Sequence, residues 1–325
     1  MGQGRAPYNV LKRSVLRPLS AGLKAGMGDG IGQQVAREAA DPRRITASSC
    51  RIFGKWPEAA LRFTFWRTEQ EILASGGQWT GIRPSFLFPH QTEEALAAVW
   101  MRELNAFCQD RNIPVLGVSV SGSAAVTAPI CQLTGYGTTA IPPVHPAPGW
   151  DIVAVGHVGM EGTALLAGWA RDELERRFTQ SFLSGALEME SGISAEPMLT
   201  GFDKWDQVLI HPLGEGGILA GLWNLAERTG LGLTARLRDI PIRQETVEIC
   251  EYFGLNPYQL ASGGMALLVS QKGEELAREF RQRGFCSQVM GKLTDQRERV
   301  VENGEDKRFL DRPAPDEIYK TGLEV

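Results

Sequence analysis

The sequence has few of the residues that build metal clusters or disulfide frameworks. It contains five cysteines and four histidines in 325 residues, and no two cysteines stand in a CxxC spacing. These residues are Cys50, Cys108, Cys131, Cys250 and Cys286, with His90, His145, His157 and His211. An odd, scattered set of cysteines indicates reduced thiols and disfavours both a disulfide scaffold and a zinc site. We expect Cys286 to be a buried strand residue.

Long apolar runs and an excess of positive charge are also missing. No apolar run reaches the ~20 residues that a membrane-spanning helix needs, and the basic N-terminal stretch lacks the apolar core of a signal peptide. The formal net charge is −4, from 34 basic and 38 acidic residues. Binding nucleic acid by neutralising its phosphates requires the opposite balance. The sequence therefore predicts a cytoplasmic protein with no membrane and no nucleic acid among its partners.

The chain does contain enough apolar material for a large core. Hydrophobic residues make up 43% of its 325 residues, and a chain of this length favours two domains. Four prolines fall between positions 141 and 149, with a fifth at Pro129, and such a stretch is typical of a domain boundary. We place the two domains at residues 1–145 and 150–325.

Strand and helix patterns alternate along both parts, which predicts an α/β fold. In the first part we expect strands at 63–66, 79–88, 113–120 and 129–136, and helices at 69–74 and 92–111. In the second part we expect strands at 151–156, 231–237, 264–270 and 286–292, and helices at 163–170, 218–229, 243–253 and 274–283. The charged segment that follows Asp295 is expected to lie on the surface.

The stretch 211–227, HPLGEGGILAGLWNLAE, combines a polar glycine-rich loop with an amphipathic helix. Gly216 and Gly217 let backbone N–H groups approach a ligand closely, and the N-terminus of the helix carries partial positive charge. Glu215, at the mouth of the loop, could meet a metal or a hydrogen-bond donor. Two interpretations stay open: a seat for an anion, or an ordinary glycine loop before a helix.

Two further glycine-rich loops could approach a ligand in the same way. Residues 24–32, KAGMGDGIG, surround Asp29 with glycines, so that backbone donors could meet an anion and the carboxylate a cation. The same loop could equally be a flexible connection. Gly159, Gly162 and Thr163 form another candidate anion cradle at the start of a helix.

The segment 5–20 is basic, with Lys12 and Arg13 among its four cationic residues and no acid. It could pack on the surface by an apolar face, or it could be a basic arm that closes on phosphates.

The second half of the chain resembles a known superfamily. The segments GWDIVAVGHVGMEGTALLA, EGGILAGLWNLAERTGLGL and IPIRQETVEICEYFGLNPYQLASGGMALLVS are similar to the C-terminal domain of aminoimidazole-ribonucleotide-synthetase-like (PurM-like) proteins. Within that superfamily the chain resembles AIR-synthase-related proteins close to the HypE hydrogenase-maturation factor. The resemblance implies two α/β domains and a dimer formed through the N-terminal sheets. It also implies that ATP and magnesium bind in a cleft and that an amide, carbamoyl or similar oxygen is phosphorylated.

Several positions depart from the pattern of that superfamily. Relatives commonly carry an acidic pair in the first glycine loop, whereas here Asp29 is followed by Gly30. They carry an Asn-Asp pair before the run that here reads LASGG, where this chain has Glu71 and Ile72. The loop GVSVSGSA offers no acid, and Pro212 stands where relatives often place aspartate.

The resemblance therefore leaves two hypotheses. In the first, the chain is an ATP-dependent enzyme: Asp29 and Glu71 hold magnesium, Lys12 or Arg13 meets phosphate, and the turn Gly216–Gly217 seats an anion beside Glu215. HypE-type chemistry with a C-terminal cysteine is not expected, because the last cysteine is Cys286. In the second, the chain is a catalytically degenerate binding or regulatory subunit, as a homodimer or paired with an active relative.

Overall fold

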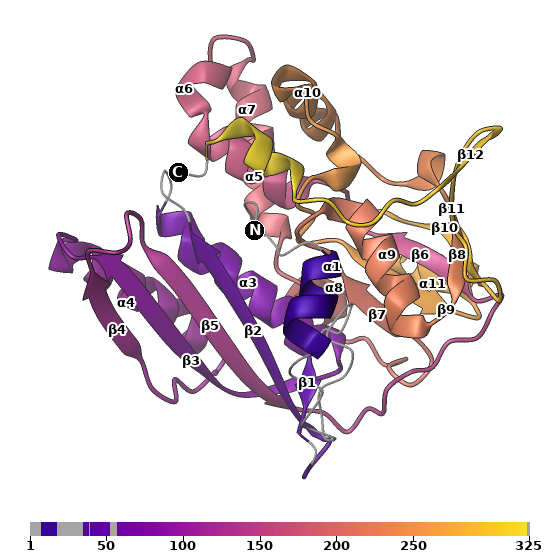
Figure 1. Cartoon of the computed structure of the whole chain (residues 1–325), viewed down its shortest axis with the longest axis horizontal. Coiled ribbons are helices and arrows are strands. Elements are labelled where there is room, and N and C mark those ends of the chain that lie inside the picture. The colour runs from indigo at the N-terminus through magenta and orange to yellow at the C-terminus, as the bar shows by residue number, and fades with distance from the viewer. Residues whose placement is uncertain (1–7, 18–34, 39, 53–56, 324–325) are drawn as a thin grey trace.

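The computed structural model describes residues 8–17, 35–38, 40–52 and 57–323, and its framework is a pair of β-sheets (Figure 1). Asp29 and the predicted loop at 24–32 lie outside the described residues. One sheet is built from strands that precede residue 139 and the other from strands that follow residue 150. None of the described helices is long and apolar enough to cross a membrane.

The first sheet has five strands in the order β1-β2-β5-β3-β4. They are β1 (Ala36–Arg37), β2 (Arg44–Ile52), β3 (Gln78–Pro89), β4 (Ser119–Ser123) and β5 (Ile130–Thr138). Only the pair β3 and β4 is parallel, and in β5 Cys131 and Leu133 are buried while Gln132 between them is exposed. Helices α3 (Pro57–Ala74) and α4 (Glu94–Asp110) lie against one face (Figure 1). The opposite face of β5 is therefore open in a single chain.

Two expectations for this region were wrong. The aromatic run at 63–66 is not a strand, because it lies inside the 18-residue helix α3. Phe63, Phe65 and Thr64 are all at most 1% exposed, so α3 is buried on every side and shows no amphipathic period for a sequence pattern to detect. The strand expected at 113–120 begins only at Ser119, and Val115 makes just an isolated bridge to Ile82.

The second sheet has seven strands in the order β12-β11-β8-β10-β6-β9-β7. They are β6 (Asp151–Val155), β7 (Leu209–Pro212), β8 (Gly232–Arg236), β9 (Ala266–Ser270), β10 (Ser287–Thr294), β11 (Arg299–Asn303) and β12 (Asp306–Phe309). In β6, Ile152 packs in one apolar cluster with Leu222 of α9 (Gly217–Thr229), and Val153 packs in another with Phe280 of α11 (Gly273–Gln282). The strand alternation therefore buries both faces of this sheet under helices.

The second half of the chain adds further helices and 3₁₀ turns. The helices are α5 (Met160–Trp169), α6 (Arg171–Leu174), α7 (Gln180–Glu188), α8 (Glu196–Leu199) and α10 (Gln244–Phe253), with 3₁₀ turns at Met189–Gly192, Leu237–Asp239, Pro257–Gln259 and Glu317–Thr321. One apolar cluster includes Phe63 of α3, Leu165 of α5 and Ile249 of α10. The two halves therefore share part of their core, and the division at 145–150 stays a prediction.

The segment after Asp295 is more ordered than expected. It forms β11, which runs parallel to β8 and buries Val301, and β12, which is exposed along its length. The surface location predicted for this segment thus holds for β12 and is wrong for β11. Cys286 precedes β10 and is exposed, so its predicted burial was also wrong.

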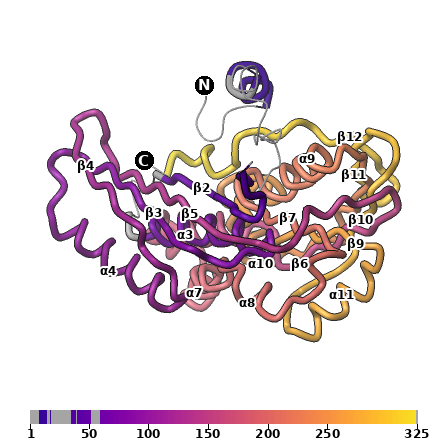
Figure 2. The backbone as a smooth tube through the Cα atoms, turned by 90° about the horizontal axis from the view of Figure 1, so that it is seen from below, coloured from indigo at the N-terminus to yellow at the C-terminus, as the bar shows by residue number. Residues whose placement is uncertain are grey.

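The described N-terminal residues form a short helix, α1 (Tyr8–Val10), which continues as a π-helix over Leu11–Leu16. In Figure 2 this helix lies on the same side of the molecule as α9 and the C-terminal segment. The Tyr8 hydroxyl donates to Glu227 Oε2 of α9 over 2.9 Å, and Arg312 donates to the Asn9 side chain over 2.8 Å. The described part of the basic segment is therefore anchored on the second half of the chain.

Candidate functional site

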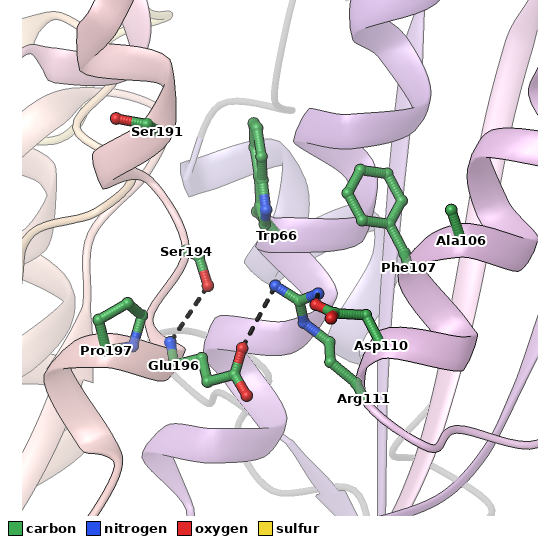
Figure 3. A pocket seen from close by; sticks show the side chains of 9 residues that line it. All are labelled: Trp66, Ala106, Phe107, Asp110, Arg111, Ser191, Ser194, Glu196 and Pro197. Carbon is green, nitrogen blue, oxygen red and sulfur yellow. Dashed lines mark hydrogen bonds and ion pairs between the residues drawn. The ribbon is translucent and has the colours of Figure 1, made fainter.

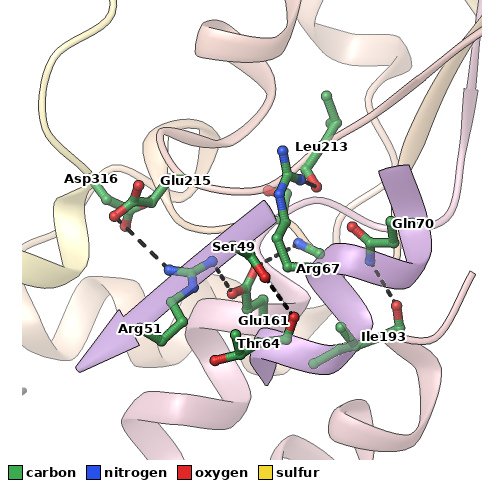
Figure 4. A network of polar contacts seen from close by, with 12 residues as sticks. Ser49, Arg51, Thr64, Arg67, Gln70, Glu161, Ile193, Leu213, Glu215 and Asp316 are labelled. Carbon is green, nitrogen blue, oxygen red and sulfur yellow. Dashed lines mark hydrogen bonds and ion pairs between the residues drawn. The ribbon is translucent and has the colours of Figure 1, made fainter. Parts of the chain in front are cut away.

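Arg51, near the end of β2, is a cation surrounded by carboxylates of the second half of the chain (Figure 4). Its guanidinium donates to Glu161 Oε1 of α5 over 2.8 Å and lies 3.9 Å from Glu215 Oε1 of the glycine loop. Burial lowers the pKa of Arg51, but the charges of Glu161 and Glu215 outweigh burial, so its pKa is raised. A buried cation held by two acids links β2 to the second half.

Glu161 and Glu215 have further partners that fix their orientation. Glu161 is 2% exposed, and its other carboxylate oxygen accepts from the Gly263 backbone N–H over 3.0 Å. Glu215 accepts a short hydrogen bond from the Tyr319 hydroxyl. Burial first, and then Glu215, raises the pKa of Tyr319. Segments from four parts of the chain therefore meet around Arg51.

The glycine loop enters α9 through two glycines with positive φ. Gly216 (φ +79°) caps α9 and Gly217 (φ +63°) begins it, both in the left-handed region that favours glycine. A Cβ at Gly217 would lie 2.5 Å from the Tyr258 carbonyl oxygen, so no other residue fits there without movement. The loop is thus held close against residues 258–260.

The carboxyl group of Asp316 occupies this helix N-terminus. Gly216 N–H donates to Asp316 Oδ2 over 2.6 Å, and Ile318 N–H donates to Asp316 Oδ1 over 3.0 Å. Burial raises the pKa of Asp316 to about 7, with these two hydrogen bonds opposing the rise and the charges of Glu215 and Glu161 adding to it. The side chain of Asp316 therefore occupies the position predicted for a ligand anion.

Glu71, predicted as a magnesium ligand, lies among arginines. Its Oε1 accepts from Arg67 over 2.6 Å, and a second nitrogen of Arg67 donates to the Leu213 carbonyl oxygen, also over 2.6 Å. The charge of Glu71 also acts on Arg228, since it opposes the lowering of that arginine's pKa. Glu71 is thus paired with an arginine of its own half, and that arginine also contacts the second half.

The carboxylates that the structure describes do not fit a magnesium site. Magnesium needs carboxylate oxygens free to face a divalent cation, whereas Glu71 and Glu215 already face Arg67 and Arg51. Within the described ranges no three histidine, cysteine, aspartate or glutamate side chains are grouped to hold a metal ion. The other predicted ligand, Asp29, lies outside those ranges.

The other predicted cradle is already hydrogen-bonded internally. Gly159 N–H donates to Ser262 Oγ over 2.8 Å, and Gly162 N–H donates to the Ala261 carbonyl oxygen over 2.9 Å. The Thr163 hydroxyl donates to the Gly159 carbonyl oxygen over 2.8 Å. These residues pack α5 against the 260–263 loop instead of presenting donors to a ligand.

Lys12 and Arg13 are exposed on the N-terminal helix. Lys12 Nζ donates to the Tyr8 hydroxyl over 3.2 Å, and Tyr8 is bonded to Glu227. Glu227 lies ten residues along α9 from Gly217, or about 15 Å at the rise of an α-helix. The described N-terminal helix therefore contacts the C-terminal end of α9, whereas the glycine turn lies at the N-terminal end.

Arg111, which the sequence did not single out, is a second link between the halves (Figure 3). At the end of α4 it donates to Glu69 of α3 over 2.6 Å and lies 3.4 Å from Glu196 of α8. Burial raises the pKa of Glu69, which also accepts from Ser194 over 2.6 Å. Arg111 and Glu196 line an open cavity of about 520 Å³.

The residues that matter most here carried little sequence signal. Arg51 stands in a strand of mixed polarity, and Asp316 stands in a charged segment expected on the surface. Neither position follows a motif, because both are defined by contacts across one hundred or more residues of chain.

Three comparisons place the chain among known proteins. Residues 147–303 match the family described as "AIR synthase related protein, C-terminal domain". A curated relative from Methanocaldococcus jannaschii, a putative hydrogenase expression/formation protein, is 23% identical over 77% of this chain and 75% of its own length. Carbamoyl dehydratase HypE of Rhodobacter capsulatus is 25% identical over 65% of this chain and 61% of its own length.

Solved structures show the same fold at low sequence identity. A structure of a HypE–HypF complex has a TM-score of 0.71 at 13% identity, covering 93% of this chain and 100% of the solved one. AaThiL complexed with AMPPCP and TMP has a TM-score of 0.69 at 16% identity, covering 94% and 97%. These matches confirm the predicted PurM-like α/β fold.

Proposed function

Since residues 147–303 match the AIR-synthase-related C-terminal domain and the chain has the PurM-like fold, we propose that it binds ATP or another phosphate ligand between its halves without magnesium. On this proposal it is a catalytically degenerate member that keeps the scaffold and an anion-binding role. The observation that carries the proposal is the pairing of Glu71 with Arg67 and of Glu215 with Arg51. Fixed cations beside these acids oppose the entry of a divalent cation.

The same arginines offer a reason to retain a phosphate ligand. A guanidinium presents a planar fork of donors that matches phosphate oxygens. Arg67 lies directly against the glycine loop, because a Cβ at Gly214 would stand 2.5 Å from one of its nitrogens. The solved relative AaThiL, which was crystallised with AMPPCP, supports a nucleotide as the first ligand to test.

The alternative is an ATP-dependent enzyme that phosphorylates a small molecule or an amide or carbamoyl oxygen. The HypE relative, a carbamoyl dehydratase, supports this candidate. In this chain it would depend on Asp29 for magnesium, with Lys12 or Arg13 at the phosphates. Both proposals keep the domain limits 1–145 and 150–325 and the cytoplasmic location. Both also keep a homodimer or heterodimer formed through the open face of the first sheet.

A thermal-shift titration separates the two candidates. ATP, ADP and pyrophosphate are added with magnesium or with a chelator, and a ligand that binds only the native state stabilises it by about 2.7 kcal/mol at a hundredfold excess over Kd. We expect the melting temperature to rise equally with and without magnesium. A rise that requires magnesium would favour the enzyme, and no rise with any of these ligands would refute phosphate-ligand binding.

Matched variants locate the binding. Arg67→Gln should abolish the rise, because it removes the guanidinium beside the glycine loop. Arg43→Gln is the control, since Arg43 is exposed and pairs only locally with Asp41. An unchanged rise in Arg67→Gln would place the ligand elsewhere.

A further inference from the structure

A cavity of about 320 Å³ lies at the opposite end of α9 from the glycine loop. Its walls come from the end of α3, the 141–146 linker, β7 and the last turn of α9, so both halves of the chain contribute. Helix α9 spans Gly217–Thr229, or about 18 Å at the rise of an α-helix. The cavity is therefore distinct from the site around Gly216 and Arg51.

Two arginines line this cavity. Arg37 of β1 donates to the Ile141 carbonyl oxygen over 3.1 Å and to the Pro42 carbonyl oxygen over 2.9 Å. Arg228 of α9 donates to the Ile210 carbonyl oxygen over 2.9 Å. Backbone carbonyls thus hold both guanidinium groups in place at the wall.

The two guanidinium groups are close enough to affect each other. Burial and, to a smaller extent, the charge of Arg37 lower the pKa of Arg228 to about 10, and the charge of Glu71 opposes them. The partial negative charge at the C-terminal end of α9 and the charge of Glu71 both act on Arg228. Arg37 adds a second positive charge from another element, which a bound anion would relieve.

The acid in the lining does not serve as that anion. Glu227 is engaged on its other side by a short ion pair with Arg299 and by the hydrogen bond from Tyr8. The remaining wall is mixed, because Ser75, His145 and Thr229 line it together with the apolar residues Val35, Ala74, Ile141, Pro142, Trp205 and Leu209. The cavity thus places two cationic side chains beside a set of apolar ones.

We propose that this cavity binds a small organic anion: a carboxylate or phosphate monoester attached to a compact apolar body. The forked donors of Arg37 and Arg228 suit the anionic group, and Trp205 with the linker prolines suits the apolar part. The volume lies at the lower end of the range for ligand pockets, about 300–1,000 Å³, which fits a metabolite smaller than a nucleotide.

Isothermal titration calorimetry with phenyl phosphate, benzoate, inorganic phosphate and the neutral benzyl alcohol tests the proposal on the full chain. We expect phenyl phosphate or benzoate to bind, and benzyl alcohol and inorganic phosphate to bind about tenfold more weakly or not at all. Arg37→Gln should weaken binding of the anion about tenfold or more, whereas Arg37→Lys should lose less. Arg43→Gln, which removes a charge from the same region outside the cavity, should bind as the wild type does.

Three results would overturn the proposal. These are no binding of either aromatic anion, equal binding by Arg37→Gln with its melting temperature unchanged, or equal affinity for benzyl alcohol. As a second readout, Trp205→Ala should weaken the binding of phenyl phosphate but not any binding of inorganic phosphate.

Discussion

Arg51 is the residue whose charge is shared most directly between the two halves. Its side chain is 12% exposed and that of Glu161 is 3% exposed, so the pair is almost fully removed from solvent. Attraction within such a pair is offset by the cost of desolvating both ions, whereas removal of one partner leaves the other charge buried and alone.

Replacement of Arg51 by methionine should therefore destabilise the fold strongly. We expect a loss of about 3–5 kcal/mol in the free energy of unfolding, measured by urea denaturation. The exposed pair Arg171–Glu175 provides the control, and Arg171→Ala should cost less than about 1 kcal/mol. In a double-mutant cycle, Glu161→Gln should recover part of the loss; strictly additive losses would show that the pair is not coupled.

Asp316 should make stability depend on pH. Its pKa is raised from 3.8 to about 7, so the folded state holds this proton more tightly than the unfolded state does. Its contribution to stability is fully present below pH ~4 and is lost as the pH rises to ~7, by a few kcal/mol at most. As the pH rises from ~4 to ~7, the melting temperature of Asp316→Asn should therefore rise relative to that of the wild type.

The exposed carboxylate Asp311 provides a control for that measurement. Asp311→Asn should follow the wild-type pH profile, because this side chain is exposed to solvent in the folded chain as it is in the unfolded one. Parallel profiles of Asp316→Asn and the wild type would show that the buried carboxylate does not titrate in this range.

At the level of elements, the two ends of α9 differ in how strictly they require glycine. Gly217 has φ +63° and no room for a Cβ, whereas Gly230, which ends the same helix at φ +69°, faces open space. Gly230→Ala should cost about 1–2 kcal/mol for its left-handed backbone. Gly217→Ala should cost more, because the clash with the Tyr258 carbonyl adds to the same strain. Chemical denaturation of both variants compares the costs, and equal losses would contradict the packing argument.

Elements with one buried and one exposed face were predicted well, and so were the largely buried strands β6 and β9. The helices at 92–111, 243–253 and 274–283 and the strands at 79–88 and 129–136 were located within a few residues. Periodicity could not reveal α3, which is buried on all sides, and the charged sequence after Asp295 hid β11. Capping glycines marked both ends of α9, so local signals sufficed there.

For the site, the sequence identified a glycine turn suited to an anion but not its occupant. The donor of Gly216 is a local feature, whereas Asp316 reaches it from 100 residues away. In the same way Glu71 and Glu215 were recognised as acids of interest, but their arginine partners depend on the tertiary fold. Spacing along the chain carries no information about such pairs.

The molecule as a whole should unfold in one step although its two sheets are separate. The apolar cluster that contains Phe63 continues into α5 and α10, and Arg51 and Arg111 add polar links between the halves. Differential scanning calorimetry should give one transition with equal calorimetric and van't Hoff enthalpies. Phe63→Ala should lower the free energy of unfolding by about 3–5 kcal/mol and move the single transition to lower temperature. Val99→Ala, at an exposed position of α4, should change the transition temperature little. Two resolved transitions would show that the halves fold independently.

The cluster around Arg51 also constrains how the sequence can drift over evolutionary time. Arg51, Glu161 and Glu215 come from three distant places in the chain and meet in a largely buried space, where Arg51 and Glu161 form the almost fully buried pair. A single substitution at Arg51 or Glu161 leaves an uncompensated buried ion, so neutral drift must pass through compensating changes. We therefore expect homologous sequences to inherit the three charges together or to lose them together.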